Sequence, residues 1–217
     1  KEMARSVFLA PTLNVTGVEP STLGISISPI DIPSVDGSTP VTFVRVGSQR
    51  QFTADVQNIA NKSVVWSFVV APGSTTTWSL NQNGVVTAPA GSLWLSGADL
   101  KATAVDGYNG VRYLEASPVL TFRQHSYIDV STDQLVLEIT PEQASNNPRN
   151  PLTVYIKSYS IESTSNTTVT NSQLIGGNSV YKFNMVRPLA NQTCNVTFKF
   201  IAHDGASYDV SFSYTNR

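Results

Sequence analysis

Apolar and polar side chains alternate along the stretch from residue 51 to residue 90. In QFTADV the apolar side chains occupy every second position from Phe52 to Val56, and VVWSF repeats the pattern through Trp66 and Phe68. A period of two residues is typical of a β-strand with one buried face. β-Sandwiches often use their largest side chain to fill the space between the two sheets. The stretch therefore predicts a sandwich core that contains Phe52, Trp66 and Phe68.

The length and charge of the chain limit its domain count and its partners. Of the 217 residues only 13% are charged, and the net charge is −1. A chain of this length accommodates two domains of about 100 residues each. Without a long-range field of one sign, nucleic acid is not an expected partner. No run approaches the roughly 18 apolar residues that a membrane helix needs, so membrane insertion is not expected either.

The sequence divides into a lead-in and two domains. Residues 1–24 carry one apolar patch followed by turn residues, which indicates an extended linker or a strand added to its own domain or to a preceding one. Residues 25–123 contain about seven strand-like runs. A polar, unpatterned stretch at 124–131 predicts a boundary, and residues 130–217 form the second domain.

The two domains end in the same way. LKATAVDG and NVTFKFIAHDG each lead into an Asp-Gly turn and a final strand, and Asp106 and Asp204 lie 98 positions apart. That spacing is close to the length of one immunoglobulin domain. The predicted fold class is therefore all-β, with two tandem immunoglobulin-like β-sandwich domains. Alternation in the second domain places three phenylalanines in its core: Phe183, Phe198 and Phe212.

Two local signals predict a hairpin and an exposed edge. Asn83-Gly84 between β-rich runs predicts a hairpin with a type I′ turn, because both residues tolerate a positive φ. The run GISISPIDIPSV alternates and then meets Pro29 and Pro33, which confines it to the edge of a sheet. Such an edge offers a route to a homo-oligomer through strand pairing.

Residues 45–123 resemble the bacterial immunoglobulin-like repeats of invasin- and intimin-type adhesins. The resemblance rests on VGSQRQFTADV at 46–56, Trp66 within VVWSF, NGVVTAP at 83–89 and LKATAVDG at 100–107. The family shares no catalytic residue and no fixed ligand. The resemblance implies an extracellular location, on a bacterial cell surface or a phage virion, and a role as a spacer or binding module.

No constellation of residues indicates catalysis or a cofactor. Zinc sites usually recruit several His or Cys residues, but the chain has only His125, His203 and one cysteine, Cys194, which is expected to be inert. Neither a nucleophile elbow nor a phosphate-binding glycine loop occurs. Asp129 and Asp133, near the predicted boundary, are weak candidates for a calcium site, the alternative being solvated loop charges.

Three aromatic residues are candidates for ligand contact: Trp78, Trp94 and Tyr108. Their rings could stack on sugars if they were exposed in one plane, and Trp94 could instead cover the first core. The predicted function is a non-enzymatic structural or adhesive module acting as a spacer. The alternatives are a carbohydrate-binding accessory domain and a self-assembling fibre or capsid-decoration subunit. Expected partners are other protein subunits, or a protein or glycan of a host surface.

Overall fold

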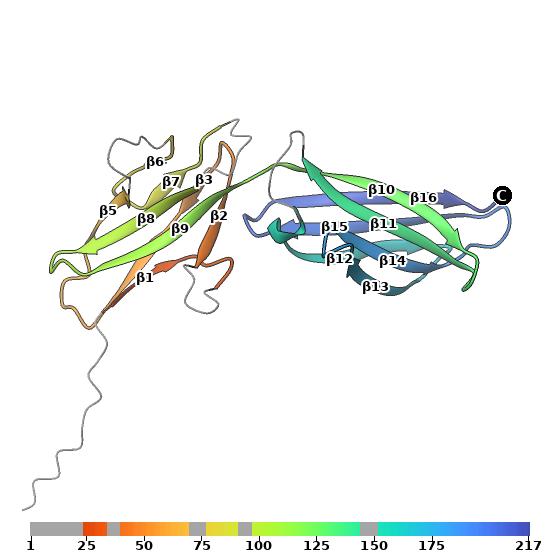
Figure 1. Cartoon of the computed structure of the whole chain (residues 1–217), viewed down its shortest axis with the longest axis horizontal. Coiled ribbons are helices and arrows are strands. Elements are labelled where there is room, and N and C mark those ends of the chain that lie inside the picture. Colours follow the sequence, from red (N-terminus) through yellow and green to blue (C-terminus); the bar gives the residue numbers. More distant parts are fainter. Residues whose placement is uncertain (1–23, 34–39, 70–76, 91–96, 144–151) are drawn as a thin grey trace, which may run out of the picture.

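The computed structural model describes residues 24–33, 40–69, 77–90, 97–143 and 152–217. These residues form two β-sandwich units that lie end to end along the long axis of the molecule (Figure 1). Apart from the short 3-10 helix η1 (Leu152–Tyr155), the regular structure of the described residues consists of strands.

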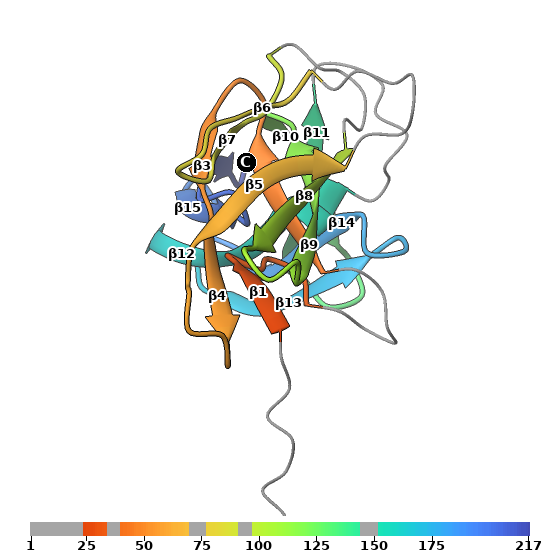
Figure 2. The same cartoon turned by 90° about the vertical axis from the view of Figure 1, so that its left-hand side faces the viewer.

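The first unit contains strands β1 to β9. Their bounds are Gly24–Ser28 (β1), Val41–Arg45 (β2), Gln49–Gln51 (β3), Thr53–Gln57 (β4), Val64–Val69 (β5), Ser79–Leu80 (β6), Val85–Thr87 (β7), Gly97–Ala104 (β8) and Asn109–Ser117 (β9). One sheet has the order β2-β9-β8-β5 and another β3-β7-β6, while β1 pairs with β4. Strands β2 and β9 run parallel. Figure 2, in which the first unit faces the viewer, shows β5, β8 and β9 side by side.

The second unit contains strands β10 to β16. Their bounds are Leu120–Asp129 (β10), Gln134–Gln143 (β11), Ile156–Ser165 (β12), Val169–Ile175 (β13), Val180–Val186 (β14), Thr193–Ala202 (β15) and Ser207–Thr215 (β16). The two sheets have the orders β10-β11-β14-β13 and β12-β15-β16. Lettered in chain order, these are the ABED and CFG sheets of a constant-type immunoglobulin sandwich. The predicted all-β sandwich fold is confirmed by this topology.

The run QFTADV does not form one continuous strand. β3 ends at Gln51 and pairs with β7, whereas β4 begins at Thr53 and pairs with β1. Between them the Phe52 backbone N–H donates to the Gly84 carbonyl (2.9 Å), and the Phe52 side chain is buried in the core. The chain therefore changes its strand partner at Phe52, which is the residue that the alternation predicts to be buried in the core.

The hairpin at Asn83-Gly84 exists, but the predicted type I′ turn is wrong. The turn begins at Asn81, whose carbonyl accepts from the Gly84 N–H (3.1 Å), and of these residues only Gly84 has a positive φ, 79°. The Asn81 side-chain oxygen accepts from the N–H groups of Asn83 and Val85 (3.0 Å each), which holds the turn in place. A Cβ at position 84 would lie 2.7 Å from the Phe52 carbonyl oxygen, so only glycine fits there.

The last hairpin of each unit is built in the same way. The Gly107 N–H donates to the Ala104 carbonyl and the Gly205 N–H to the Ala202 carbonyl, both at 3.0 Å. The two glycines have φ values of 84° and 85°. The repeated Asp-Gly signal thus corresponds to a repeated turn geometry.

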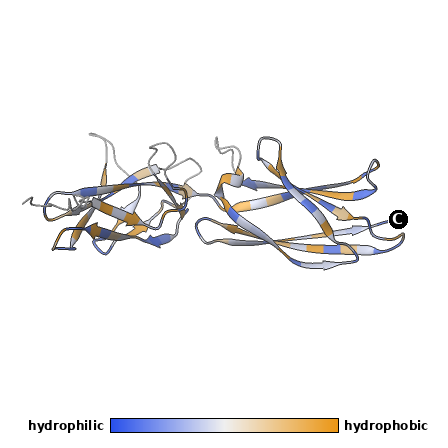
Figure 3. Cartoon of the chain, turned by 90° about the horizontal axis from the view of Figure 1, so that it is seen from below, coloured by the Kyte–Doolittle hydropathy of each residue, from blue (hydrophilic) through white to orange (hydrophobic). Residues whose placement is uncertain are grey.

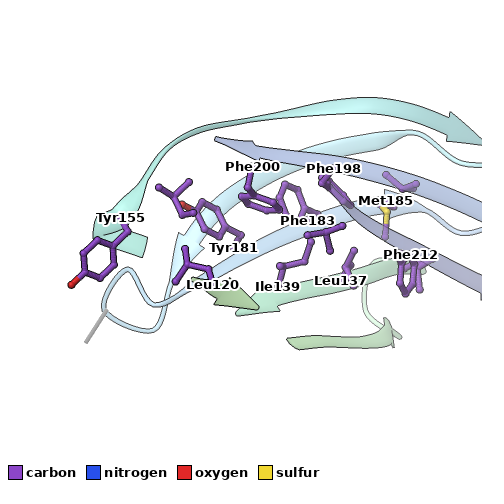
Figure 4. Packing of buried hydrophobic residues seen from close by; sticks show 14 of the residues in the cluster. Leu120, Leu137, Ile139, Tyr155, Tyr181, Phe183, Met185, Phe198, Phe200 and Phe212 are labelled. Atoms are coloured by element: carbon purple, nitrogen blue, oxygen red, sulfur yellow. The ribbon is translucent and has the colours of Figure 1, made fainter. Parts of the chain in front are cut away.

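Each unit has its own apolar core, and hydrophobic and hydrophilic residues alternate along many of the strands (Figure 3). In the first unit Trp66 (6% exposed) packs with Phe52 and Leu100, while Phe68 is half-buried at the rim. In the second unit Phe183, Phe198 and Phe212 lie in a single cluster (Figure 4). The rings of Phe183 and Phe198 are 4.3 Å apart between centroids.

The polar stretch expected to separate the domains is part of a paired strand. β10 pairs with β11 along its whole length, from Leu120 opposite Gln143 to Asp129 opposite Gln134. The stretch lacks a clear pattern because β10 is an edge strand with many exposed side chains. We propose that the boundary lies instead at Pro118 and Val119, the two residues between β9 and β10.

Candidate functional site

The two units share a packed junction, and this junction is the candidate functional site. Only Pro118 and Val119 connect β9 to β10. Proline fixes one backbone dihedral, so the connection has little freedom to rotate. The relative position of the units is further held by side chains that cross from one to the other.

Phe43 on β2 is the central apolar contact of the junction. Its side chain is fully buried and belongs to the core cluster of the second unit, although β2 belongs to the first. The Phe43 ring lies 5.1 Å from the Tyr155 ring in an edge-to-face arrangement and 5.7 Å from the His203 ring. Val44, the next residue, is buried in the core of the first unit. Adjacent residues of one strand thus enter two different cores.

A buried hydrogen bond accompanies this apolar contact. The Tyr155 hydroxyl donates to Glu115 Oε1 over 2.7 Å, and both side chains are fully buried. Glu115 on β9 is the direct parallel partner of Phe43 on β2, so the two side chains leave the sheet on the same face. A hydrogen bond contributes about 0.5–1.5 kcal/mol to stability, and leaving a buried partner unsatisfied costs about 1–3 kcal/mol. The junction therefore combines an aromatic contact with a polar contact of defined geometry.

An ion pair fixes the backbone that carries Phe43. Asp31 accepts from both terminal nitrogens of Arg50 (2.6 and 2.9 Å), and it also accepts from the Phe43 N–H (2.8 Å). The Arg50 guanidinium also donates to the Phe43 carbonyl. A two-point contact between arginine and a carboxylate restricts geometry as well as adding energy. The ion pair thus orients Phe43 toward the second unit.

Polar contacts continue along the rim of the junction. The Ser117 hydroxyl donates to the carboxylate of Asp204, which also accepts from the Ala206 N–H (2.9 Å). A cavity of about 370 Å³ lies beside them and is lined by residues of both units, including Arg45 and His203. The Ser117 hydroxyl is directed to a carboxylate and not to an imidazole, so this group lacks the serine–histidine bond of a hydrolytic nucleophile.

His203 makes the junction sensitive to pH. Burial lowers the pKa of the His203 imidazole; nearby Lys157 and Arg50 act in the same direction, while Asp31 and Asp204 oppose them. As the pH falls, the His203 imidazole takes up a proton near pH 6.5 in the unfolded chain and only at a lower pH in the folded chain. Stability contributed by neutral His203 is therefore complete above about pH 6.5 and is lost as the pH falls through the lower folded pKa.

We expect the His203→Gln variant to lose part of this pH dependence. Urea unfolding at a series of pH values from 7.5 to 5 should show a smaller fall in unfolding free energy for His203→Gln than for the unmodified chain. His125→Gln is the matched control, because His125 is exposed on β10 and has no role at the junction. Parallel profiles for the unmodified chain and His203→Gln would contradict the assignment.

The aromatic residues expected to contact a ligand do not form one exposed group. Trp78 is 5% exposed and packs in the first core with Trp66, so its ring cannot stack on a sugar. Tyr108 is 43% exposed, next to the turn between β8 and β9. Trp94 lies outside the described residues.

The two candidate calcium ligands have other partners. Asp129 accepts from the backbone N–H and the hydroxyl of Ser131, and these hydrogen bonds lower the pKa of its carboxyl group. Asp133 forms an ion pair with Arg187 (2.8 Å). Among the described residues no group of three or more His, Cys, Asp or Glu side chains is placed to hold a metal ion. Cys194 is fully buried, which raises the pKa of its thiol.

The junction residues were missed in the sequence, although one signal was present. In VTFVR the adjacent apolar residues Phe43 and Val44 point to opposite faces of a strand. Apolar side chains on both faces indicate that both faces are covered. Glu115 and Tyr155 carried no comparable signal, because their partner lies in the other unit.

Comparisons with known proteins find weak similarity to several solved structures. No family model matches the chain, and no curated protein matches it. The extracellular cadherin domains 1–4 of Protocadherin Gamma B7 are 12% identical, with a TM-score of 0.34, and the match covers 90% of this chain and 50% of that one. The adhesin InvE of Yersinia pseudotuberculosis is 12% identical (TM-score 0.31, 89% of this chain and 58% of that one).

A third similar structure comprises domains 4–9 of the surface layer protein SbsC, at 13% identity and a TM-score of 0.28. The match covers 91% of this chain and 32% of that one. This chain thus spans about half or less of the length of most of these proteins. The fold assignment itself rests on the strand order described above. Among the described residues there is no helix long and apolar enough to cross a membrane.

Proposed function

We propose that the chain is a non-enzymatic structural and adhesive module of an extracellular protein, on a bacterial cell surface or a phage virion. Its two units act as a rigid spacer. The observation that carries the proposal is the shared core at the junction, where Phe43 of the first unit packs among residues of the second. Inter-domain contacts of this kind oppose the relative motion that linked domains otherwise show.

The path of the chain supports a spacer role. In Figure 1 the first described strand, β1, begins in the first unit, and the C terminus lies at the far end of the second unit. A load applied to the two ends would pass along the long axis and across the junction. The ladders of antiparallel strands and the packed junction would carry it without a flexible link.

The first unit is also proposed to be a bacterial immunoglobulin-like repeat. The motifs that support this lie at structural positions: Trp66 is in the core, and Gly84 is at a turn that only glycine fits. Residues of this kind specify a fold and bind no common ligand. The role of such a module is to present loops at a fixed distance from its point of attachment.

Measurement of rotational diffusion tests the rigid spacer. We expect 15N relaxation to give one common, anisotropic rotational diffusion tensor for the amides of both units. The matched control inserts six Gly and Ser residues between Pro118 and Val119 and carries Phe43→Ser, which together should let the two units tumble separately. Different correlation times for the two units in the unmodified chain would rule out a rigid spacer.

A further inference from the structure

Within the described residues, the second unit has a groove on one side of its sandwich. β12 is the outer strand of one sheet and β13 is the outer strand of the other, within the described part of the chain. The Tyr159 hydroxyl donates to the Ser172 hydroxyl oxygen (2.7 Å), so the two strands approach each other across the groove. Behind this contact the core phenylalanines are fully buried, so the groove is a surface feature and not a gap in the core.

The inner face of β13 is exposed in the groove. Leu174 on β13 lies directly opposite Tyr181 on β14, so both side chains are on the same face of the sheet. Tyr181 is buried against the core, yet Leu174 is 45% exposed. A side chain on the inward face of a sandwich is normally covered by the opposite sheet. Among the described residues, the opposite sheet does not cover Leu174.

An apolar pocket continues from this exposed face. It has a volume of about 620 Å³ and lies between the start of β12, η1 and the turn from β13 to β14. Its apolar walls are formed by Val154, Ile156, Tyr159, Leu174 and Tyr181. Burial, together with the nearby Tyr159, raises the pKa of Tyr181 to about 12. Thr153, Lys157, Ser158 and Asn178 also line the pocket, and its apolar walls suit an apolar side chain.

The edge of β13 is less protected than that of β12. β12 carries Lys157 and Glu162 and has two irregularities in its register with β15. β13 has no charged residue and no proline; its register with β14 has one irregularity, between Val169 and Asn171, and is regular from Asn171 to Ile175. Charges, prolines and bulges are the usual means of preventing strand addition at an edge. An added strand would therefore pair with β13 and place alternate side chains in the pocket.

We propose that this groove binds residues 7–15 of a second copy of the chain, which adds as a strand to β13. The proposal rests on the proposed structural role and extends it to self-assembly. Val7, Leu9, Leu13 and Val15 have the same parity, which would place them on one face of an added strand, while Phe8 and Ala10 would add apolar surface to the other face. Residues 6–18 include no charged residue, which matches the uncharged edge and the apolar pocket. Pro11 is compatible because the added strand is an outer strand, whose alternate N–H groups need no partner.

Chain length favours a second copy over the same copy. The nine steps from Val15 to Gly24 span at most about 30 Å when fully extended. β1 begins beside Gly110, since a Cβ there would touch the Ile25 backbone, and β9 continues from Gly110 for about 23 Å before the junction. Gly17 and Pro20 fall within the connecting residues and favour turns over full extension. The segment of the same copy thus has little length left to reach β13.

Copies joined in this way form an open chain. The groove is on the second unit and the segment precedes the first, so the contact is head-to-tail and each copy keeps one free groove and one free segment. Contacts of this type extend into fibres unless the rotation between copies closes a ring. The spacer would then be one link of a longer assembly.

Disulfide trapping between two variants tests this proposal. The single native cysteine, Cys194, is fully buried, so introduced thiols report their own contacts. Leu9→Cys and Leu174→Cys are prepared as separate full-length proteins, mixed and oxidised. We expect a cross-linked dimer in the mixture and not from either variant alone. The control pairs Leu9→Cys with Val130→Cys, a 92% exposed position on another surface, and should give no dimer.

The Leu174→Glu variant gives a second readout without cross-linking. Because Leu174 is half-exposed, the fold should persist, while self-association measured by sedimentation velocity should weaken at least tenfold. Absence of the mixed dimer would overturn the proposal, and so would efficient disulfide formation within single molecules of the Leu9→Cys, Leu174→Cys double variant. Either result would leave the rigid spacer standing, because 15N relaxation tests that role on the isolated chain.

Discussion

Replacing Phe43 with alanine is expected to destabilise the second unit, although Phe43 belongs to a strand of the first. Truncation of a buried phenylalanine costs about 3–5 kcal/mol, from lost apolar contact and from the cavity that remains. The Phe43 ring contacts Tyr155 and His203, and both belong to the second unit. The cost should therefore appear in the unfolding of that unit.

The two units can be followed separately in one experiment. All three tryptophans lie between residues 66 and 94, so tryptophan fluorescence reports the first unit. Hydrogen exchange of β11 and β14 amides reports the second. Phe52→Ala is the matched control, because Phe52 is equally buried but lies in the first core. Phe52→Ala should lower the fluorescence midpoint, whereas Phe43→Ala should mainly increase exchange in β11 and β14.

The shared core would be contradicted if the effect of Phe43→Ala appeared in the first unit and not in the second. If Phe43→Ala left exchange in the second unit unchanged, the ring would contribute nothing to that unit, and the packed junction would not support a rigid spacer. An intermediate variant, Phe43→Leu, retains apolar volume and should lose less than the alanine variant. If Phe43→Leu is more stable than Phe43→Ala, the destabilisation comes from lost packing and not from a disturbance of strand β2.

The sequence was informative for strands whose apolar side chains alternate and all face one core. The pattern through Trp66 has its apolar positions on the buried face, and the repeated Asp-Gly signal has the same turn geometry in both units. These features depend on neighbours close in the chain and on a single packed layer. Alternation does not specify which strands pair, so the parallel pairing of β2 with β9 came only from the structure.

The junction was not predictable to the same degree, because its residues face a unit that begins later in the chain. Glu115 has the sequence context of an ordinary surface carboxylate, but it is fully buried and accepts a hydrogen bond from Tyr155 of the other unit. The boundary that we propose at Pro118 and Val119 is inconspicuous in the sequence for a related reason. β10 has several exposed positions, so its sequence resembles a linker, while two residues are too few to show a composition of their own.

The register of β9 shows a further limit of alternation. In VRYLEAS the apolar residues change parity between Tyr113 and Leu114, so the pattern fits either face. The structure turns Leu114 inward, and Arg112 therefore points into the first core while Val111 is 41% exposed. Because Leu114 and Arg112 share the inward face of β9, the Arg112 guanidinium lies in an apolar interior.

Replacing Arg112 with methionine is expected to stabilise the first unit by about 1–4 kcal/mol, the range for exchanging a buried ion pair for apolar residues of similar volume. Arg112 is fully buried; one terminal nitrogen donates to the Ile27 carbonyl, but Nε and the other terminal nitrogen have no hydrogen-bond partner among the described residues. Burial lowers the pKa of the guanidinium, and the negative charge of Asp31 opposes this only in part. Methionine has a similar length and carries no charge into the core.

Urea unfolding followed by tryptophan fluorescence measures this change in the first unit, and hydrogen exchange of β11 and β14 amides measures the second unit. Arg123→Met is the control: Arg123 forms an exposed ion pair with Glu142 on the second unit, and such pairs contribute at most about 1 kcal/mol. Arg112→Lys should be less stable than Arg112→Met, because it keeps a buried positive charge without the planar guanidinium. If Arg112→Met instead lost more than about 1 kcal/mol, the hydrogen bond to Ile27 would outweigh the cost of burying the charge, and Arg112 would be a structural tie between β9 and β1.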